Sequence, residues 1–180
     1  MCGGVIFPFK QAYRQALEQF YQPEDLDLFD RVGHVRSLFW QKSEPVLPII
    51  IENGELAGTP DAGELIVRWG NRDRTVPFPQ TGWARIDSIY AGKWDYLKPE
   101  PVIIPVTYGV EKGRWFRITG GIRGLLVQRG QDRRVYMLTD EADEQYAAVT
   151  GHPRMPMLMD QTDFDWIAGD PMAQFLQRRL

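Results

Sequence analysis

Short runs of Val, Ile and Leu, each of strand length, constrain this fold more than any other sequence feature. They lie at residues 46–51, 65–67, 102–104, 115–118, 125–127 and 135–138. The segments between them carry Gly, Pro, Asn or Asp turn signals, such as Glu52-Asn53-Gly54 and Arg129-Gly130-Gln131-Asp132. This alternation predicts a largely antiparallel sheet or an irregular barrel.

Helical patterns flank these predicted strands. An apolar segment at residues 5–7 comes first. Apolar residues then recur with helical spacing and predict an amphipathic helix that ends before Pro23; they are Ala12, Tyr13, Ala16, Leu17, Phe20 and Tyr21. We predict further helices at 140–148, capped by Asp140, and at 165–180, interrupted near Gly169-Asp170-Pro171. Residues 70–100, with scattered Pro and Gly, predict a long ordered surface loop. The expected fold is α+β: one domain over residues 1–180, an irregular, largely antiparallel β-barrel or sheet with flanking helices.

Length and composition exclude several classes of protein. The 180 residues suffice for one full hydrophobic core, and 43% apolar with 25% charged residues is typical of soluble globular proteins. No apolar run approaches the roughly 18 residues that a membrane span needs. We therefore expect a cytoplasmic protein without a membrane partner.

The charge is segregated along the chain. The net charge of −3 argues against a domain that holds duplex DNA mainly by bulk electrostatics. Arginines nevertheless cluster at 68–85 and 114–134, while acidic residues gather at 18–30 and 140–144. A local basic groove therefore remains compatible with the sequence.

Cys2 is the sole cysteine and directly follows Met1. An intramolecular disulfide and a cysteine-rich zinc site are thereby excluded. Methionine aminopeptidases remove Met before a small residue, which would leave a 1,2-aminothiol. Its α-amine, with a pKa of about 7.7–8.0, is partly neutral at physiological pH and can form a Schiff base with an aldehyde. The thiol can then close a thiazolidine, although a small buried residue at position 2 is the alternative interpretation.

Two further residues are candidates for proton transfer. His152 lies in the turn His152-Pro153-Arg154-Met155-Pro156, where an imidazole could donate a proton while Arg154 binds a phosphate. Glu111 follows a hydrophobic segment and could orient the amine or shuttle its proton. An exposed turn histidine and a solvated turn glutamate are the alternative interpretations.

Aromatic and arginine residues stand together at two places, Arg68-Trp69-Gly70 and Trp83-Ala84-Arg85. Rings that stack on bases and guanidinium groups that bind phosphates suit a single-stranded nucleic acid. Buried tryptophans beside surface arginines would give the same pattern.

Several of these features occur in a characteristic order. The chain begins Met1-Cys2-Gly3, Trp69-Gly70 is followed by Ala84-Arg85, Pro105 precedes Glu111 by six residues, and His152-x-Arg154-Met155-Pro156 comes last. This order resembles the SOS-response-associated peptidase (SRAP) family. The resemblance implies a single α+β domain that crosslinks to abasic sites in single-stranded DNA through a thiazolidine, and so protects them in the DNA damage response.

The resemblance also implies a role for individual residues. Cys2 would be the nucleophile, Glu111 would assist the amine, and His152 would help to open the deoxyribose ring. The residues that would contact DNA are Trp69, Trp83, Arg85 and Arg154. The implied enzyme has a cysteine peptidase or lyase-like activity, which includes release of its own N-terminal segment or reversal of the crosslink. It would act as a monomer, without metal or cofactor, on nucleoid DNA.

One departure from the family pattern concerns Trp83, which stands where the family usually has an asparagine. The sequence therefore predicts that an amide near the reacting sugar or the cysteine is missing, unless Asn71 or Gln80 supplies it from the loop. A noncovalent single-stranded DNA-binding protein that has lost the chemistry is one alternative function. A glutamine amidohydrolase with an N-terminal cysteine nucleophile is another, although 180 residues contain no evident ammonia-accepting domain.

Overall fold

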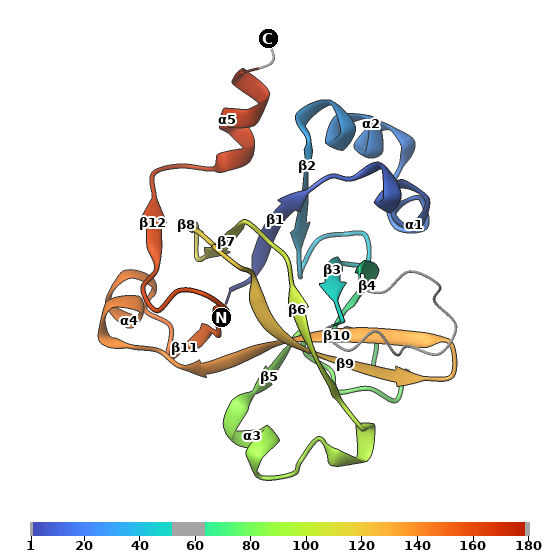
Figure 1. The fold of residues 1–180 in the computed structure, drawn as a ribbon, viewed down its shortest axis with the longest axis vertical. Helices are drawn as coiled ribbons and strands as arrows, with labels where there is room; N and C mark the ends of the chain where they lie inside the picture. Colours follow the sequence, from blue (N-terminus) through green and yellow to red (C-terminus); the bar gives the residue numbers. More distant parts are fainter. Residues whose placement is uncertain (1, 52–63, 179–180) are drawn as a thin grey trace.

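Five strands close into a barrel at the centre of the fold (Figure 1). The computed structural model describes residues 2–51 and 64–178. Around the ring the strands are β10 (Asp132–Glu141), β4 (Glu64–Trp69), β3 (Val46–Ile50), β6 (Glu100–Ile104) and β9 (Ile122–Arg129). The pair β10–β4 is parallel and the other pairs in the ring are antiparallel, including the β9–β10 pair that closes it.

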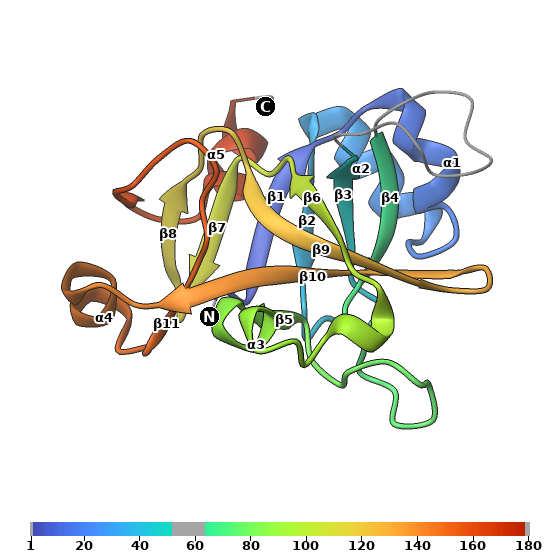
Figure 2. The ribbon, with the colours of Figure 1, turned by 60° about the horizontal axis from the view of Figure 1, so that its bottom comes forward.

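A second sheet packs beside the barrel and is antiparallel throughout. Its strand order is β12 (Asp165–Ile167), β8 (Arg114–Arg117), β7 (Tyr108–Glu111), β1 (Gly4–Pro8) and β2 (His34–Leu38). Strands β5 (Trp83–Arg85) and β11 (Arg154–Pro156) both pair with the end of β10. Figure 2 shows β9 and β10 crossing the molecule, with β11 near the end of β10.

Short helices flank these sheets. They are η1 (Gln11–Tyr13), α1 (Arg14–Leu17), α2 (Pro23–Val32), α3 (Ile86–Tyr90), η2 (Asp95–Leu97), α4 (Glu144–Thr150) and α5 (Pro171–Gln177). Helices α1 and α2 lie beside the sheet that contains β1 and β2, whereas α3 lies on the side of β5 (Figure 1).

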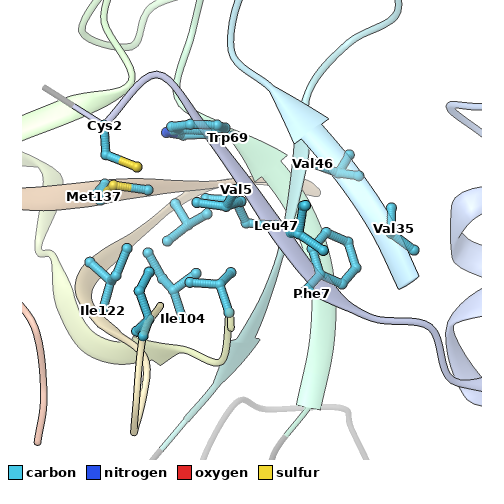
Figure 3. Packing of buried hydrophobic residues seen from close by; sticks show 14 of the residues in the cluster. Cys2, Val5, Phe7, Val35, Val46, Leu47, Trp69, Ile104, Ile122 and Met137 are labelled. Carbon is cyan, nitrogen blue, oxygen red and sulfur yellow. The ribbon is translucent and has the colours of Figure 1, made fainter. Parts of the chain in front are cut away.

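The hydrophobic core runs without interruption from the barrel into the second sheet (Figure 3). Val5 and Phe7 of β1 are fully buried, as are Leu47 of β3 and Ile104 of β6. Shared burial of this kind makes the two sheets one cooperative unit, because neither face can be exposed without uncovering the other. The predicted α+β fold with an irregular barrel is confirmed.

Each predicted run of apolar residues falls on a strand, namely β3, β4, β6, β8, β9 or β10, apart from terminal residues such as Ile51 and Ile118. The turn predicted at Glu52-Asn53-Gly54 lies outside the described residues. The apolar segment at residues 5–7 forms β1, although it was not assigned to a strand. Strands β2, β5, β7, β11 and β12 were not predicted. These are short, and several alternate buried with half-exposed residues, so they contain no continuous apolar run.

The helix predictions were wrong in their boundaries. The first helix ends at Leu17, and Pro23 begins α2 instead of following a longer helix, because proline fits the first turn where no backbone donor is needed. Strand β10 continues through Asp140, so α4 begins later, where the Asp143 side chain accepts a hydrogen bond from the Tyr146 backbone N–H.

Two longer segments also contain more regular structure than predicted. The expected loop at 70–100 includes β5, α3 and η2. The expected helix at 165–180 is divided into β12 and α5, and Asp170 caps α5 by accepting from Met172 N. In the latter case the break near Gly169 was read correctly, but the segment before it is extended.

Gly109 on β7 provides a test of the packing around the N-terminus. A Cβ atom there would lie 2.4 Å from Phe116 Cζ and 3.0 Å from Cys2 Sγ. We expect Gly109→Ala to lower the free energy of unfolding by about 1–3 kcal/mol in a denaturant titration, because the buried neighbours must shift. Gly3→Ala is the control, since its Cβ would meet no atom within 4 Å. Equal stability of the two variants would contradict this packing.

Candidate functional site

The pairing of β1 with β7 places Cys2 in the core. Gly4 pairs with Val110, and Gly3 N donates to Val110 O at 2.9 Å. Cys2 is fully buried, and its thiol donates to Gly4 O at 3.1 Å. Burial raises the pKa of this thiol from 9.0 to about 12. The thiol is therefore protonated at neutral pH.

Trp83 holds the other side of Cys2. Its indole Nε1 donates to Cys2 O at 3.1 Å, and its ring packs against Phe39 and Trp69 with centroids 4.7 and 5.8 Å away. The sequence predicts that an amide near the cysteine is missing. At position 83 the indole N–H of the tryptophan donates instead to the cysteine's own carbonyl, and the Asn71 amide donates to the carbonyls of Asp73 and Phe78.

Glu111 is the last residue of β7 and follows Val110, the residue that pairs with Gly4. Its side chain is buried. Its negative charge raises the pKa of Cys2, and it also acts on His152. The carboxylate thus lies within electrostatic reach of both predicted reactive groups. The alternative of a solvated turn residue was wrong, because Glu111 is only 6% exposed.

His152 follows α4 in a tight turn and is partly buried. Its Nδ1 lies 3.1 Å from both the amide N and the carbonyl O of Arg154, which fixes the ring against its own backbone. Burial lowers the pKa of His152 below 6.5, Lys112 acts in the same direction, and Glu111 opposes both. Lys112 Nζ donates to Gly151 O at 3.4 Å, so the end of β7 and the histidine turn lie together.

Tyr146 of α4 was missed by the sequence analysis, which had no signal to separate it from other core aromatics. It is fully buried, and its hydroxyl has no hydrogen-bond partner among the described residues. Burial raises the pKa of Tyr146, and the nearby Cys2 and Glu111 contribute to the increase. The Phe116 ring lies between Tyr146, at a centroid distance of 6.5 Å, and the Gly109 position next to Cys2.

Arg85 and Arg154 are brought together by β10, whose Thr139 and Glu141 pair with them. Arg85 Nη2 donates to Asp87 at 2.6 Å, and Arg154 Nη2 lies 3.8 Å from the same carboxylate. The Arg85 hydrogen bond is the main reason that the pKa of Asp87 falls to about 2. Arg154 also donates to Thr139 O at 2.8 Å. The two guanidinium groups thus share one anion already, which is the arrangement needed to share a phosphate.

The tryptophans selected from the sequence are placed differently from the prediction. Trp69 and Trp83 are 1% and 8% exposed, and Trp69 Nε1 donates to Gly82 O at 2.9 Å. Neither ring offers a face to a nucleic-acid base in this structure. Their burial corrects the expectation that they contact DNA: Trp83 donates to the Cys2 carbonyl, and Trp69 packs against Trp83 inside the core.

Within the part of the chain that the structure describes, no group of His, Cys, Asp and Glu could hold a metal ion. No helix among those residues is long and apolar enough to cross a membrane. The expected absence of a cofactor stays a prediction.

Comparison with known proteins supports the fold alone. No protein-family model matches the chain, and no curated protein matches it. A crystal structure of a protein from Bacteroides thetaiotaomicron matches with a TM-score of 0.54 and 16% sequence identity, over 89% of this chain and 78% of that chain. At this identity the likeness concerns the architecture and says nothing of the chemistry.

Tyr146→Phe tests whether the buried hydroxyl costs stability. Removing an unpartnered buried group should raise the free energy of unfolding by about 1 kcal/mol, measured by denaturant titration. Tyr136→Phe is the matched control, because Tyr136 is also fully buried but donates to Pro79 O at 2.9 Å. That variant should lose a comparable amount. A larger loss for Tyr146→Phe than for Tyr136→Phe would mean that the Tyr146 hydroxyl has a stabilising partner.

Proposed function

We propose that this protein, once Met1 is removed, binds single-stranded DNA and forms a covalent thiazolidine with the aldehyde of an abasic site. The observation that carries the proposal is the convergence of Cys2, Glu111 and His152 at the adjoining ends of β1, β7 and α4. Their position agrees with the roles that the SRAP resemblance implies. Met1 lies outside the described residues, so its removal stays a prediction.

The proposed chemistry proceeds in two additions. The α-amine of Cys2 attacks the aldehyde carbon, and loss of water gives an imine. The thiol then adds across the C=N bond: sulfur bonds to carbon, and the thiol proton passes to nitrogen. Glu111 accepts a proton from the attacking amine and returns it to the departing hydroxyl.

His152 would act before these additions, because an abasic deoxyribose is mostly a closed ring. Donating a proton to the ring oxygen favours the open aldehyde. The lowered pKa of His152 keeps the imidazole mainly neutral at pH 7, where it can also accept a proton in the reverse direction. Arg85 and Arg154 would bind the flanking phosphates by exchanging Asp87 for phosphate oxygens.

Intact-mass spectrometry with an abasic single-stranded oligonucleotide tests the proposal. The purified wild type should lack Met1 and form a denaturation-resistant adduct whose mass is the sum of both molecules less one water. Cys2→Ala keeps the amine but cannot close the ring, so only a labile imine is expected. Cys2→Ser is the control for Met1 removal, since serine is also small. A stable adduct with Cys2→Ala would refute the mechanism, and binding without any adduct would favour the noncovalent alternative.

His152→Ala tests the proton-transfer role. We expect slower adduct formation with little change in noncovalent affinity, measured as initial rate and as fluorescence anisotropy. Acid protonates the amine in both proteins, so the informative quantity is the wild-type rate divided by the variant rate. Because only wild type gains an imidazolium, this ratio should rise as the pH falls below 6.5. Equal losses of rate and affinity would instead assign His152 to DNA contact.

A further inference from the structure

The loop at residues 39–45 leads directly away from the Cys2 site. Phe39 N donates to Gly3 O at 3.0 Å, and the Phe39 ring packs against Trp83, which holds the Cys2 carbonyl. A polymer bound at Cys2 therefore has this loop as an immediate neighbour.

Trp40 in this loop is the exception among the tryptophans. It is 75% exposed, whereas Trp69, Trp83, Trp94 and Trp115 are each no more than 8% exposed. Its ring meets the edge of Phe39 at a centroid distance of 4.7 Å, so the contact orients the indole without covering it. An oriented, exposed indole next to the candidate site is a stacking platform.

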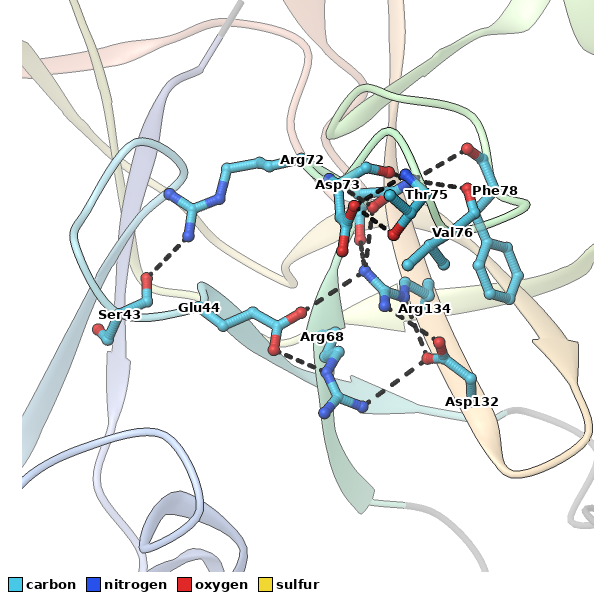
Figure 4. Close-up of polar contacts among 12 residues, drawn as sticks. Ser43, Glu44, Arg68, Arg72, Asp73, Thr75, Val76, Phe78, Asp132 and Arg134 are labelled. Atoms are coloured by element: carbon cyan, nitrogen blue, oxygen red, sulfur yellow. Dashed lines mark hydrogen bonds and ion pairs between the residues drawn. The ribbon is translucent and has the colours of Figure 1, made fainter.

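Residues 42, 44 and 45 of the same loop line an open cleft of about 710 Å³, whose cationic lining residues are Lys42, Arg72, Arg74 and Arg134. Two of these cations, Arg72 and Arg134, are held by hydrogen bonds and ion pairs within the protein (Figure 4). Arg72 donates to Gln41 O at 2.6 Å and to Ser43 O at 3.1 Å, which ties the Trp40 loop to the segment after β4. Arg134 is buried and donates to Asp132 and to Gly70 O.

The other two cations are available to a ligand. Lys42 and Arg74 are exposed, and neither forms a hydrogen bond or ion pair with a described residue. Both carboxylates that line the cleft are engaged already. Glu44 accepts from Arg68 and pairs with Arg134, while Asp73 accepts from Thr75 N and Oγ1 at 2.8 Å. The lining contains four cationic side chains, Lys42, Arg72, Arg74 and Arg134, against the two carboxylates, so its net charge is positive.

We propose that single-stranded DNA leaving the Cys2 site stacks a base on Trp40 and places its next phosphates on Lys42 and Arg74 in this cleft. The surface formed by Trp40, Lys42 and Arg74 extends the contact beyond Arg85 and Arg154. This inference rests on the proposed function for the identity of the partner. It does not require the crosslink, because stacking and phosphate binding are noncovalent.

An undamaged, fluorescein-labelled oligothymidylate isolates this surface from the chemistry, with anisotropy titrations at several salt concentrations. Trp40→Ala should weaken binding about tenfold, and Trp40→Phe should restore most of the loss, because a phenyl ring also stacks. Arg74→Glu should weaken binding and reduce the salt slope by about 0.7, the value for one phosphate contact on a single strand. Tyr96→Ala and Arg31→Glu are matched controls, since both residues are exposed on other parts of the molecule.

The outcomes separate this inference from the proposed function. Three results would each contradict the proposed surface: wild-type affinity for Trp40→Ala and Arg74→Glu, equal losses of affinity in the two control variants, or equally tight binding of a duplex. Such a result would leave the adduct assay with abasic DNA unaffected. Conversely, loss of affinity in these variants together with no adduct in wild type would support the surface and overturn the crosslinking proposal.

Discussion

The antiparallel pairing of β1 with β7 is the constraint on which the candidate site depends. Backbone hydrogen bonds fix residues 3 and 4 against Val110, so the position of Cys2 relative to Glu111 follows from the ladder and not from a side-chain rotamer. Chain ends are usually among the most mobile parts of a domain. Here the first strand lies inside a shared core, so the conformational entropy of the candidate group at the N-terminus is already lost when the protein folds.

Trp83 connects this ladder to the rest of the molecule. Its indole donates to the Cys2 carbonyl, its ring packs on Phe39 and Trp69, and its strand pairs with β10. A smaller amide could make the hydrogen bond but could not fill the same space. The tryptophan therefore joins a polar contact at the N-terminus with apolar packing beneath the Trp40 loop. The side chain at position 83 thus supplies both the donor to the Cys2 carbonyl and part of the apolar packing.

The sequence predicts the barrel well because its central strands contain consecutive buried apolar residues, as residues 122–129 and 135–138 illustrate. The sequence does not predict strands whose formation depends on pairing with a distant part of the chain. Strand β7 has a glycine at its centre, and Gly109 is required only because Phe116 and Cys2 crowd it from elsewhere in the chain. The order of the motifs identified Cys2, Glu111 and His152 as candidate site residues. It also suggested Trp69 and Trp83 as DNA contacts, but their burial makes them core residues. Tyr146 is distinguished by an unpartnered buried hydroxyl, and Trp40 by its exposure beside the buried aromatic cluster of Phe39, Trp69 and Trp83. Neither property can be recognised in the sequence.

The burial of Cys2 bears on the order of the proposed steps. A neutral thiol is a small, nearly apolar group that the core accommodates at little cost, whereas a thiolate would be strongly penalised. With a pKa of about 12, sulfur is a poor first nucleophile at neutral pH. In the proposed reaction the amine would therefore react first, and the thiol would add to an imine already held beside it. Capture of the aldehyde would thus depend on how long the strand stays bound, which gives the cationic and aromatic surface around the site a kinetic role.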